Sequence, residues 1–160
     1  MLEILDLPTT SLIGLGSATS LAEGKGPMLW GKFRPRAKDL PRVQPGFYNV
    51  SIYPEELTMD SFTPTTKYTA WVGVAVAEGQ EVPQDLESLR VGGGLYAKII
   101  YQGLPQDFGP FAARLYGQLI PEAGYRIDNT RAHFEYLPPG YRPDDPEATE
   151  EVWVPVRQGA

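Results

Sequence analysis

The sequence has no cysteine and only one histidine, His133. Without cysteine the chain cannot form a disulfide, a thiolate nucleophile or a cysteine-ligated zinc or iron–sulfur site. One histidine cannot make a multi-histidine metal site, and it leaves a single imidazole as a candidate general base. We therefore expect no bound metal and no other cofactor.

Basic charge and long apolar runs are also scarce. Lys and Arg number 14 against 20 Asp and Glu, which gives a net charge of -6. Nucleic-acid-binding proteins usually have a basic surface, so we expect no direct DNA binding. Apolar stretches such as residues 70–77 are too short to span a bilayer, and no signal-peptide pattern precedes them. The sequence predicts a soluble, cytoplasmic protein that does not engage a membrane.

The remaining composition is that of a globular domain. Hydrophobic residues make up 42% and charged residues 21% of the chain. A length of 160 residues suits one domain. The 17 glycines and 16 prolines are spread along the chain, so they divide it into short elements.

Two kinds of periodicity predict the elements. Apolar residues at helical spacing predict a helix over 107–119, and Pro27 favours the first turn of a shorter one over 27–33. Alternating, β-rich segments predict strands at 11–19, 47–53, 67–77, 95–101, 131–137 and 151–156. Residues 34–45 read as a connector and 85–90 as a helical turn. The internal Pro155 predicts an edge position for the last strand.

The order of elements is strand, helix, strand, strand, and then the same again. We therefore expect a single domain over 1–160, with pseudo-repeats at about 9–80 and 88–157. Two such units predict an α+β fold in which an antiparallel sheet carries both helices on one face. A ligand pocket would then lie between the halves.

Side-chain alternation along the strands suggests which residues line that pocket. In the strand at 67–77, Ala70, Val72 and Val74 form an apolar face typical of a core. The other face places Trp71 beside small residues such as Gly73, an arrangement that predicts a cavity wall.

Glu135 lies in the middle of a predicted strand, on the face opposite Phe134 and Tyr136. A carboxylate in a half-apolar setting needs a partner. One interpretation is a pair with Arg131, or simple exposure to water. The other is a carboxylate surrounded by aromatic rings, to which a ligand supplies the positive charge. The aromatic residues have two interpretations as well, since most tryptophan and phenylalanine side chains pack in cores.

Several segments together resemble a known family, the effector-binding domain of the gyrase-inhibitor-like superfamily. This domain is also the ligand module of some AraC-type and MerR-type multidrug regulators, and the integron-associated effector-binding protein is a close variant. The matching segments lie at 28–33, 68–74, 93–97, 116–125, 134–136 and 151–156. Since this chain begins almost at its first expected strand, we expect no DNA-binding domain before it.

The resemblance implies a small-molecule-binding protein that senses or sequesters lipophilic cations, in some relatives to regulate transcription. In such domains the glutamate of the Phe-Glu-Tyr-like strand anchors the cation, and here that residue is Glu135. The residues implied to line the pocket are Tyr53, Trp71, Phe111 and Trp153, with Phe108 beside them.

Two other functions remain open. The acidic segment 144–151 could dock on a protein partner such as a topoisomerase, or could be a solvated loop. Some relatives of this fold hydrolyse electrophilic ring compounds. In that case Glu135 would activate water, with His133 on the same strand face assisting.

Overall fold

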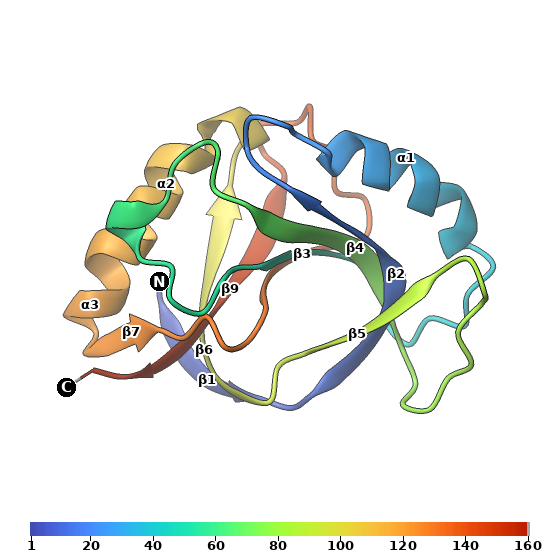
Figure 1. Cartoon of the computed structure of the whole chain (residues 1–160), viewed down its shortest axis with the longest axis horizontal. Helices are drawn as coiled ribbons and strands as arrows, with labels where there is room; N and C mark the ends of the chain where they lie inside the picture. Colours follow the sequence, from blue (N-terminus) through green and yellow to red (C-terminus); the bar gives the residue numbers. More distant parts are fainter. Residues whose placement is uncertain (160) are drawn as a thin grey trace.

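The chain folds around one curled antiparallel sheet, seen in a computed structural model that describes residues 1–159 apart from the side chain of Met59. Figure 1 shows the two helical segments lying against this sheet. The strands are β1 Glu3–Leu7, β2 Thr10–Thr19, β3 Phe47–Ile52, β4 Tyr68–Val76, β5 Glu87–Val91, β6 Gly94–Gln102, β7 Tyr125–Ile127, β8 His133–Leu137 and β9 Thr149–Gln158.

The first helix, α1, spans Gly26–Ala37. The second helical segment runs from α2 (Phe108–Arg114) through a π-helical turn, η3 (Leu115–Leu119), into the short α3 (Ile120–Glu122). Two 3₁₀ turns, η1 Met59–Ser61 and η2 Pro105–Asp107, lie outside these helices. Within residues 1–159, no helix is long and apolar enough to cross a membrane.

The strand order confirms the duplicated unit. The sheet reads β1-β6-β9-β8-β3-β4-β2-β5, with β7 added beside β9. The sequence of strands outward from the centre is β3, β4, β2, β5 on one side and β8, β9, β6, β1 on the other. In the first half α1 lies between β2 and β3, and in the second half the α2 segment lies between β6 and β8. The two central strands, β3 and β8, are therefore equivalent members of the two units and pair with each other. The exact limits of the repeats stay a prediction.

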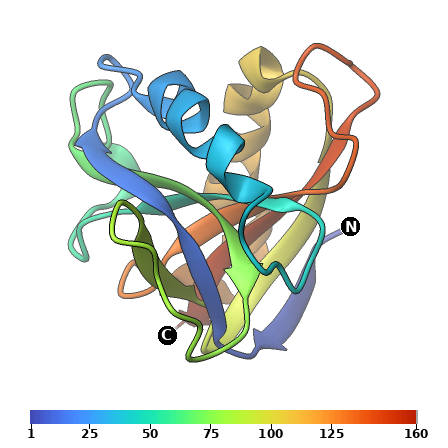
Figure 2. The ribbon, with the colours of Figure 1, turned by 90° about the vertical axis from the view of Figure 1, so that its right-hand side faces the viewer.

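The ends of the sheet are tied together by one long two-stranded ribbon. Strand β1 pairs with β6 and β2 pairs with β5 in a single continuous register, as Leu7↔Gly94 and Thr10↔Val91 show. At the bend between these pairs, Gly92 and Gly93 have φ values of 88° and 82°, which glycine adopts without steric cost. The ribbon therefore closes the curl that is visible in Figure 2.

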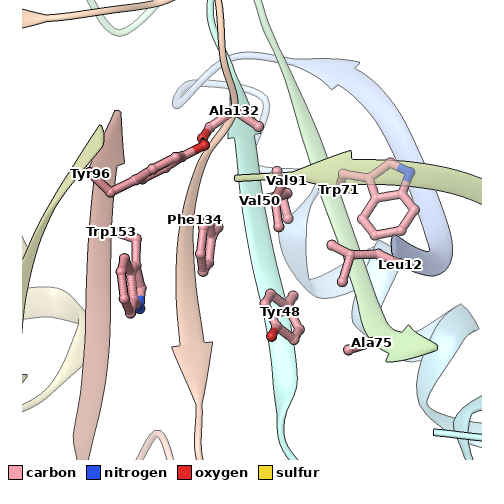
Figure 3. Packing of buried hydrophobic residues seen from close by; sticks show 10 residues of the cluster. All are labelled: Leu12, Tyr48, Val50, Trp71, Ala75, Val91, Tyr96, Ala132, Phe134 and Trp153. Atoms are coloured by element: carbon pink, nitrogen blue, oxygen red, sulfur yellow. Dashed lines mark hydrogen bonds between the residues drawn. The ribbon is translucent and has the colours of Figure 1, made fainter. Parts of the chain in front are cut away.

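The two faces of the sheet have different covers. On one face, α1 packs on Val72 and Val74, and the α2 segment packs on Val152 and Val154. We call this the helix face; the expectation that both helices share one face is confirmed. Among residues 1–159 no helix covers the opposite face, and its aromatic side chains are buried within the curl, as Figure 3 shows.

Three expectations about single elements were wrong, and the strands β1 and β7 were not expected. Residues 85–90 do not form a helical turn, because Glu87–Val91 pairs with β2 as β5. The predicted connector from residue 34 begins inside α1, which continues through Pro35 to Ala37. Strand β1, which the sequence analysis missed, precedes the first expected strand.

Pro155 does not mark an edge strand. Strand β9 pairs with β6 along one side, and β8 and β7 pair with it on the other. Pro155 falls between the stretch that pairs with β8, which ends at Trp153, and the stretch that pairs with β7, which begins at Val156. A proline without an N–H is tolerated there because two partners meet at this point of the strand.

Candidate functional site

A cavity of about 660 Å³ lies on the helix face, where the two halves of the sheet meet. Strands β3 and β8 form its floor and α2 forms one wall. The segment that follows β3 contributes Leu57, Thr58 and Phe62, and in Figure 1 this green segment runs beside α2. The lining residues are Leu21, Ser51, Tyr53, Leu57, Thr58, Phe62, Pro105, Phe108, Gly109, Ala112, Ala113, Tyr116, Ile127, Asn129, His133, Phe134, Glu135, Val152 and Trp153.

Glu135 is the acidic residue of this lining. The sheet register places it between Asn49 of β3 and Val152 of β9, so its side chain lies on the helix face. The Asn49 side-chain amide donates a hydrogen bond to Glu135 Oε1 at 3.1 Å. The side chain is half-buried. Since it lines the cavity, its remaining exposure is toward that space.

A second carboxyl lies next to Glu135. Glu150 is buried on β9, two residues before Val152 and therefore on the same face. Burial, and after it the charge of Glu150, raise the pKa of Glu135 to about 8. Burial also raises the pKa of Glu150, whereas its hydrogen bonds with Glu135 and Tyr141 oppose that shift. The two carboxyls therefore titrate as an interacting pair, in which the charge of one opposes ionisation of the other.

The wall beside Glu135 carries a chain of polar side chains. His133 Nε2 lies 2.6 Å from Asn129 Oδ1, and His133 Nδ1 lies 3.3 Å from the Tyr116 hydroxyl. The Tyr53 ring packs edge-on against the imidazole at 4.8 Å. Burial lowers the pKa of His133 to about 3, so this imidazole is neutral at physiological pH.

Four of the six residues that the sequence predicted for the site contribute to the cavity. Glu135, Tyr53 and Phe108 line it from β8, the end of β3 and α2. Trp153 is also part of the lining, but its ring stacks on Phe134 at 5.7 Å in the cluster of the opposite face (Figure 3). Its indole ring is therefore not directed at Glu135.

Phe111 and Trp71 lie outside the cavity lining. Phe111 packs on Tyr101, with ring centroids 4.9 Å apart, behind the wall that Phe108 forms. A role in ligand binding stays a prediction for both residues, and their positions outside the cavity lining do not support it.

The prediction of a cavity wall on the Trp71 face of β4 was wrong. Trp71 pairs with Val50, whereas its neighbour Val72 pairs with Asn49, which pairs in turn with Glu135. Trp71 and Glu135 are therefore on opposite faces of the sheet. The indole is 2% exposed and packs with Leu12 (Figure 3). The small residues around it, Gly16 and Gly73, leave room for the ring itself, because an added Cβ would lie 2.2 and 2.4 Å from its atoms.

Four further residues of the site were not predicted from the sequence: Glu150, Tyr116, Asn129 and Asn49. Glu150 was included in the acidic segment that was expected to be exposed, yet it is 6% exposed. Alternation back from Val152 would have indicated its face. Asn49 was given no role in the site, although it falls within the strand predicted at 47–53. For Asn129, in a loop, the sequence contains no comparable signal.

No three side chains of His, Asp or Glu come close enough to hold a metal ion among the residues that the structure describes.

Sequence and structure comparisons agree on a family. The family model described as the GyrI-like small molecule binding domain matches residues 1–157. The chain belongs to this family. The resemblance found in the sequence is thereby confirmed. The family is one of small-molecule-binding domains, and this GyrI-like domain is a member of it. No curated protein sequence matches it.

Solved structures share the fold at low sequence identity. SAV2435, solved bound to tetraphenylphosphonium, is 13% identical with a TM-score of 0.72, covering 98% of this chain and 94% of that one. The integron cassette protein VCH_CASS2 of Vibrio cholerae is 20% identical with a TM-score of 0.61, covering 98% and 95%. A hydrolase from Listeria innocua is 10% identical with a TM-score of 0.57, covering 98% and 91%. At these identities the likeness establishes the fold.

Proposed function

We propose that this GyrI-like domain binds lipophilic organic cations in the cavity, with Glu135 as the anionic anchor, and thereby senses or sequesters them. The observation that carries the proposal is the Glu135 carboxyl, beside the buried Glu150, at a largely apolar cavity whose lining includes no Lys or Arg. The charge of the pair has no cation partner within the wall, so a positively charged ligand would complete it.

The aromatic residues of the cavity support the same ligand class. Rings from Tyr53, Phe62, Phe108 and Tyr116 contribute to the wall. Aromatic faces attract organic cations by about 0.5–2 kcal/mol per contact, more when the contact is desolvated. The same rings bury the apolar part of a ligand, at about 25 cal/mol per Å² of apolar surface. A cavity of about 660 Å³ is large enough for a ligand with several rings.

Tetraphenylphosphonium is the first probe, because SAV2435 was solved with it and its charge does not change with pH. Isothermal titration calorimetry at pH 8 would compare the wild type with Glu135→Gln. We expect the substitution to weaken binding at least about tenfold, since a desolvated ion pair in the cavity is lost.

Glu87→Gln is the matched control. Glu87 is exposed on β5, outside the cavity, and its replacement changes the net charge by the same amount. If both variants lose affinity equally, the overall field of the acidic protein explains the binding. If Glu135→Gln binds as well as the wild type, Glu135 is not the anchor.

A second candidate function is hydrolysis of an electrophilic ring compound. The observation that favours it is the position of the Glu135 carboxyl at the cavity, where burial and Glu150 raise its pKa to about 8, because a stronger base removes a proton from water more readily. The water oxygen would bond to the ring carbon as the ring C–O bond breaks. The proton would pass through Glu135 to the leaving oxygen.

Incubation with styrene oxide tests this candidate. Diol formation above the buffer rate, abolished in Glu135→Gln and retained in Glu87→Gln, would establish hydrolysis. Absence of the diol, together with tight binding of tetraphenylphosphonium, would leave binding as the function of the cavity.

A further inference from the structure

We propose that the cavity selects cations that carry N–H groups, such as protonated amines and amidines, over fully substituted cations of the same shape. Two acceptors would receive these hydrogens, the Glu135 carboxylate and the hydroxyl oxygen of Tyr116. The inference rests on the proposed function and specifies the ligand class of the same cavity.

The side-chain orientation of Asn129 is fixed by a hydrogen bond to the backbone. Asn129 Nδ2 donates to the carbonyl oxygen of Leu57 at 3.0 Å. A reversed amide would bring two oxygens together, and neither has a hydrogen to donate. The Oδ1 atom must therefore face His133, at 2.6 Å from Nε2.

This orientation fixes the tautomer of His133. Because Asn129 Oδ1 accepts only, His133 Nε2 must carry the hydrogen. A neutral imidazole has one N–H, so His133 Nδ1 is an acceptor. Burial, which lowers the pKa of this histidine to about 3, keeps the ring neutral over the physiological range.

The Tyr116 hydroxyl hydrogen is then committed to His133. The two atoms lie 3.3 Å apart, and Nδ1 has only a lone pair to offer. Burial raises the pKa of Tyr116 well above its usual value, so the hydroxyl does not ionise. Each of the three hydrogen bonds in the chain Tyr116–His133–Asn129–Leu57 is therefore donated in the direction of Leu57. The oxygen of Tyr116 keeps its lone pairs, and among the described residues no donor is bonded to it.

The rest of the wall supplies few donors for such acceptors. It contains no Lys or Arg, and the indole N–H of Trp153 donates to Glu151 at 2.9 Å. The hydroxyls of Ser51, Tyr53 and Thr58 can rotate to donate or to accept. Glu135 accepts from Asn49 at Oε1, and both Glu135 and Tyr116 line the cavity. A ligand with N–H groups would donate hydrogen bonds to both acceptors, whereas a fully methylated cation would donate none.

Three pyrene derivatives provide a matched ligand series: pyren-1-ylmethylammonium and its N,N-dimethyl and N,N,N-trimethyl forms. They share one aromatic body and one positive charge at pH 7, and they carry three, one and no N–H groups. Losing the hydration of an N–H costs free energy, so a pocket without acceptors would prefer the trimethyl form. We expect the opposite order here, with the primary ammonium bound about tenfold tighter than the trimethyl form. Pyrene fluorescence measures the affinities.

Tyr116→Phe tests the second acceptor. We expect this variant to bind the primary ammonium several-fold less tightly and the trimethyl form within about twofold of the wild type, by the general strength of one such bond. Tyr125→Phe, outside the cavity lining, is the control and should retain the wild-type ratio. An unchanged ratio in Tyr116→Phe would exclude Tyr116 as the acceptor.

The ligand series in the wild-type protein does not depend on any variant folding. Equal or tighter binding of the trimethyl form, lost in Glu135→Gln, would refute the N–H preference and leave the cation-binding function intact. If none of the three ligands binds, both proposals are wrong.

Discussion

Cation binding by this domain should become stronger as the pH rises from 6 to 8 and then level off. In the empty protein burial and the neighbouring Glu150 raise the pKa of Glu135 to about 8, so below that pH the carboxyl carries a proton. A cation placed beside Glu135 favours the ionised form and lowers this pKa. Binding below pH 8 must therefore release the proton. The affinity should fall with each unit of acidification.

The size of the effect follows from linkage between binding and protonation. Below the pKa of the empty protein and above that of the complex, the dissociation constant changes about tenfold per pH unit. The affinity at pH 6 should then be about a hundredfold weaker than above pH 8. The affinity must increase with pH, because the raised pKa is that of Glu135 in the empty protein.

Calorimetry with tetraphenylphosphonium in two buffers of different ionisation enthalpy measures both quantities. The difference in heat gives the number of protons released, which we expect to be close to one at pH 6–7 and close to zero at pH 9. Glu135→Gln should remove the pH dependence together with most of the affinity. An affinity that is constant from pH 6 to 9, without proton release, would refute the reasoning. Either Glu135 would then be ionised in the empty protein, or the cation would bind away from it.

Three further predictions concern other residues. Glu150→Gln removes the charge that helps to raise the pKa of Glu135, so the pH at which affinity levels off should move downward in the same calorimetry. Trp71→Phe should cost about 1–3 kcal/mol in urea unfolding, since it leaves a gap in the core, yet should leave the affinity unchanged because the ring is on the opposite face. If that substitution abolishes binding without unfolding the protein, our placement of the cavity is wrong. Folded His133 has its pKa lowered to about 3 from 6.5, so the free energy of unfolding should fall as the pH drops below 6.5. The slope should approach about 1.4 kcal/mol per unit, and His133→Gln should flatten it.

Short-range patterns predicted much of the fold. Alternation located β2, β3, β4, β6 and β8, and helical spacing located the α2 segment. These signals depend on neighbouring residues alone. The missed β5 is different, because Glu87–Val91 becomes a strand through pairing with β2, more than seventy residues earlier in the chain.

The candidate site was only partly predictable. Alternation separated Glu135 from Phe134, and the structure places their side chains on different faces of the sheet. The same reasoning failed for Trp71. An alternating strand defines two faces, but it does not indicate which of them a helix will cover.

The sequence by itself determined the α+β class, the duplicated order of elements and the position of Glu135 on its strand, because each follows from periodicity along the chain. Tertiary structure decided which face carries the cavity, that Glu150 is buried beside Glu135, and that hydrogen bonds run from Tyr116 to Leu57. Those features join residues far apart in the chain. Their burial and hydrogen-bond direction arise only when strands, helix and loops are brought together.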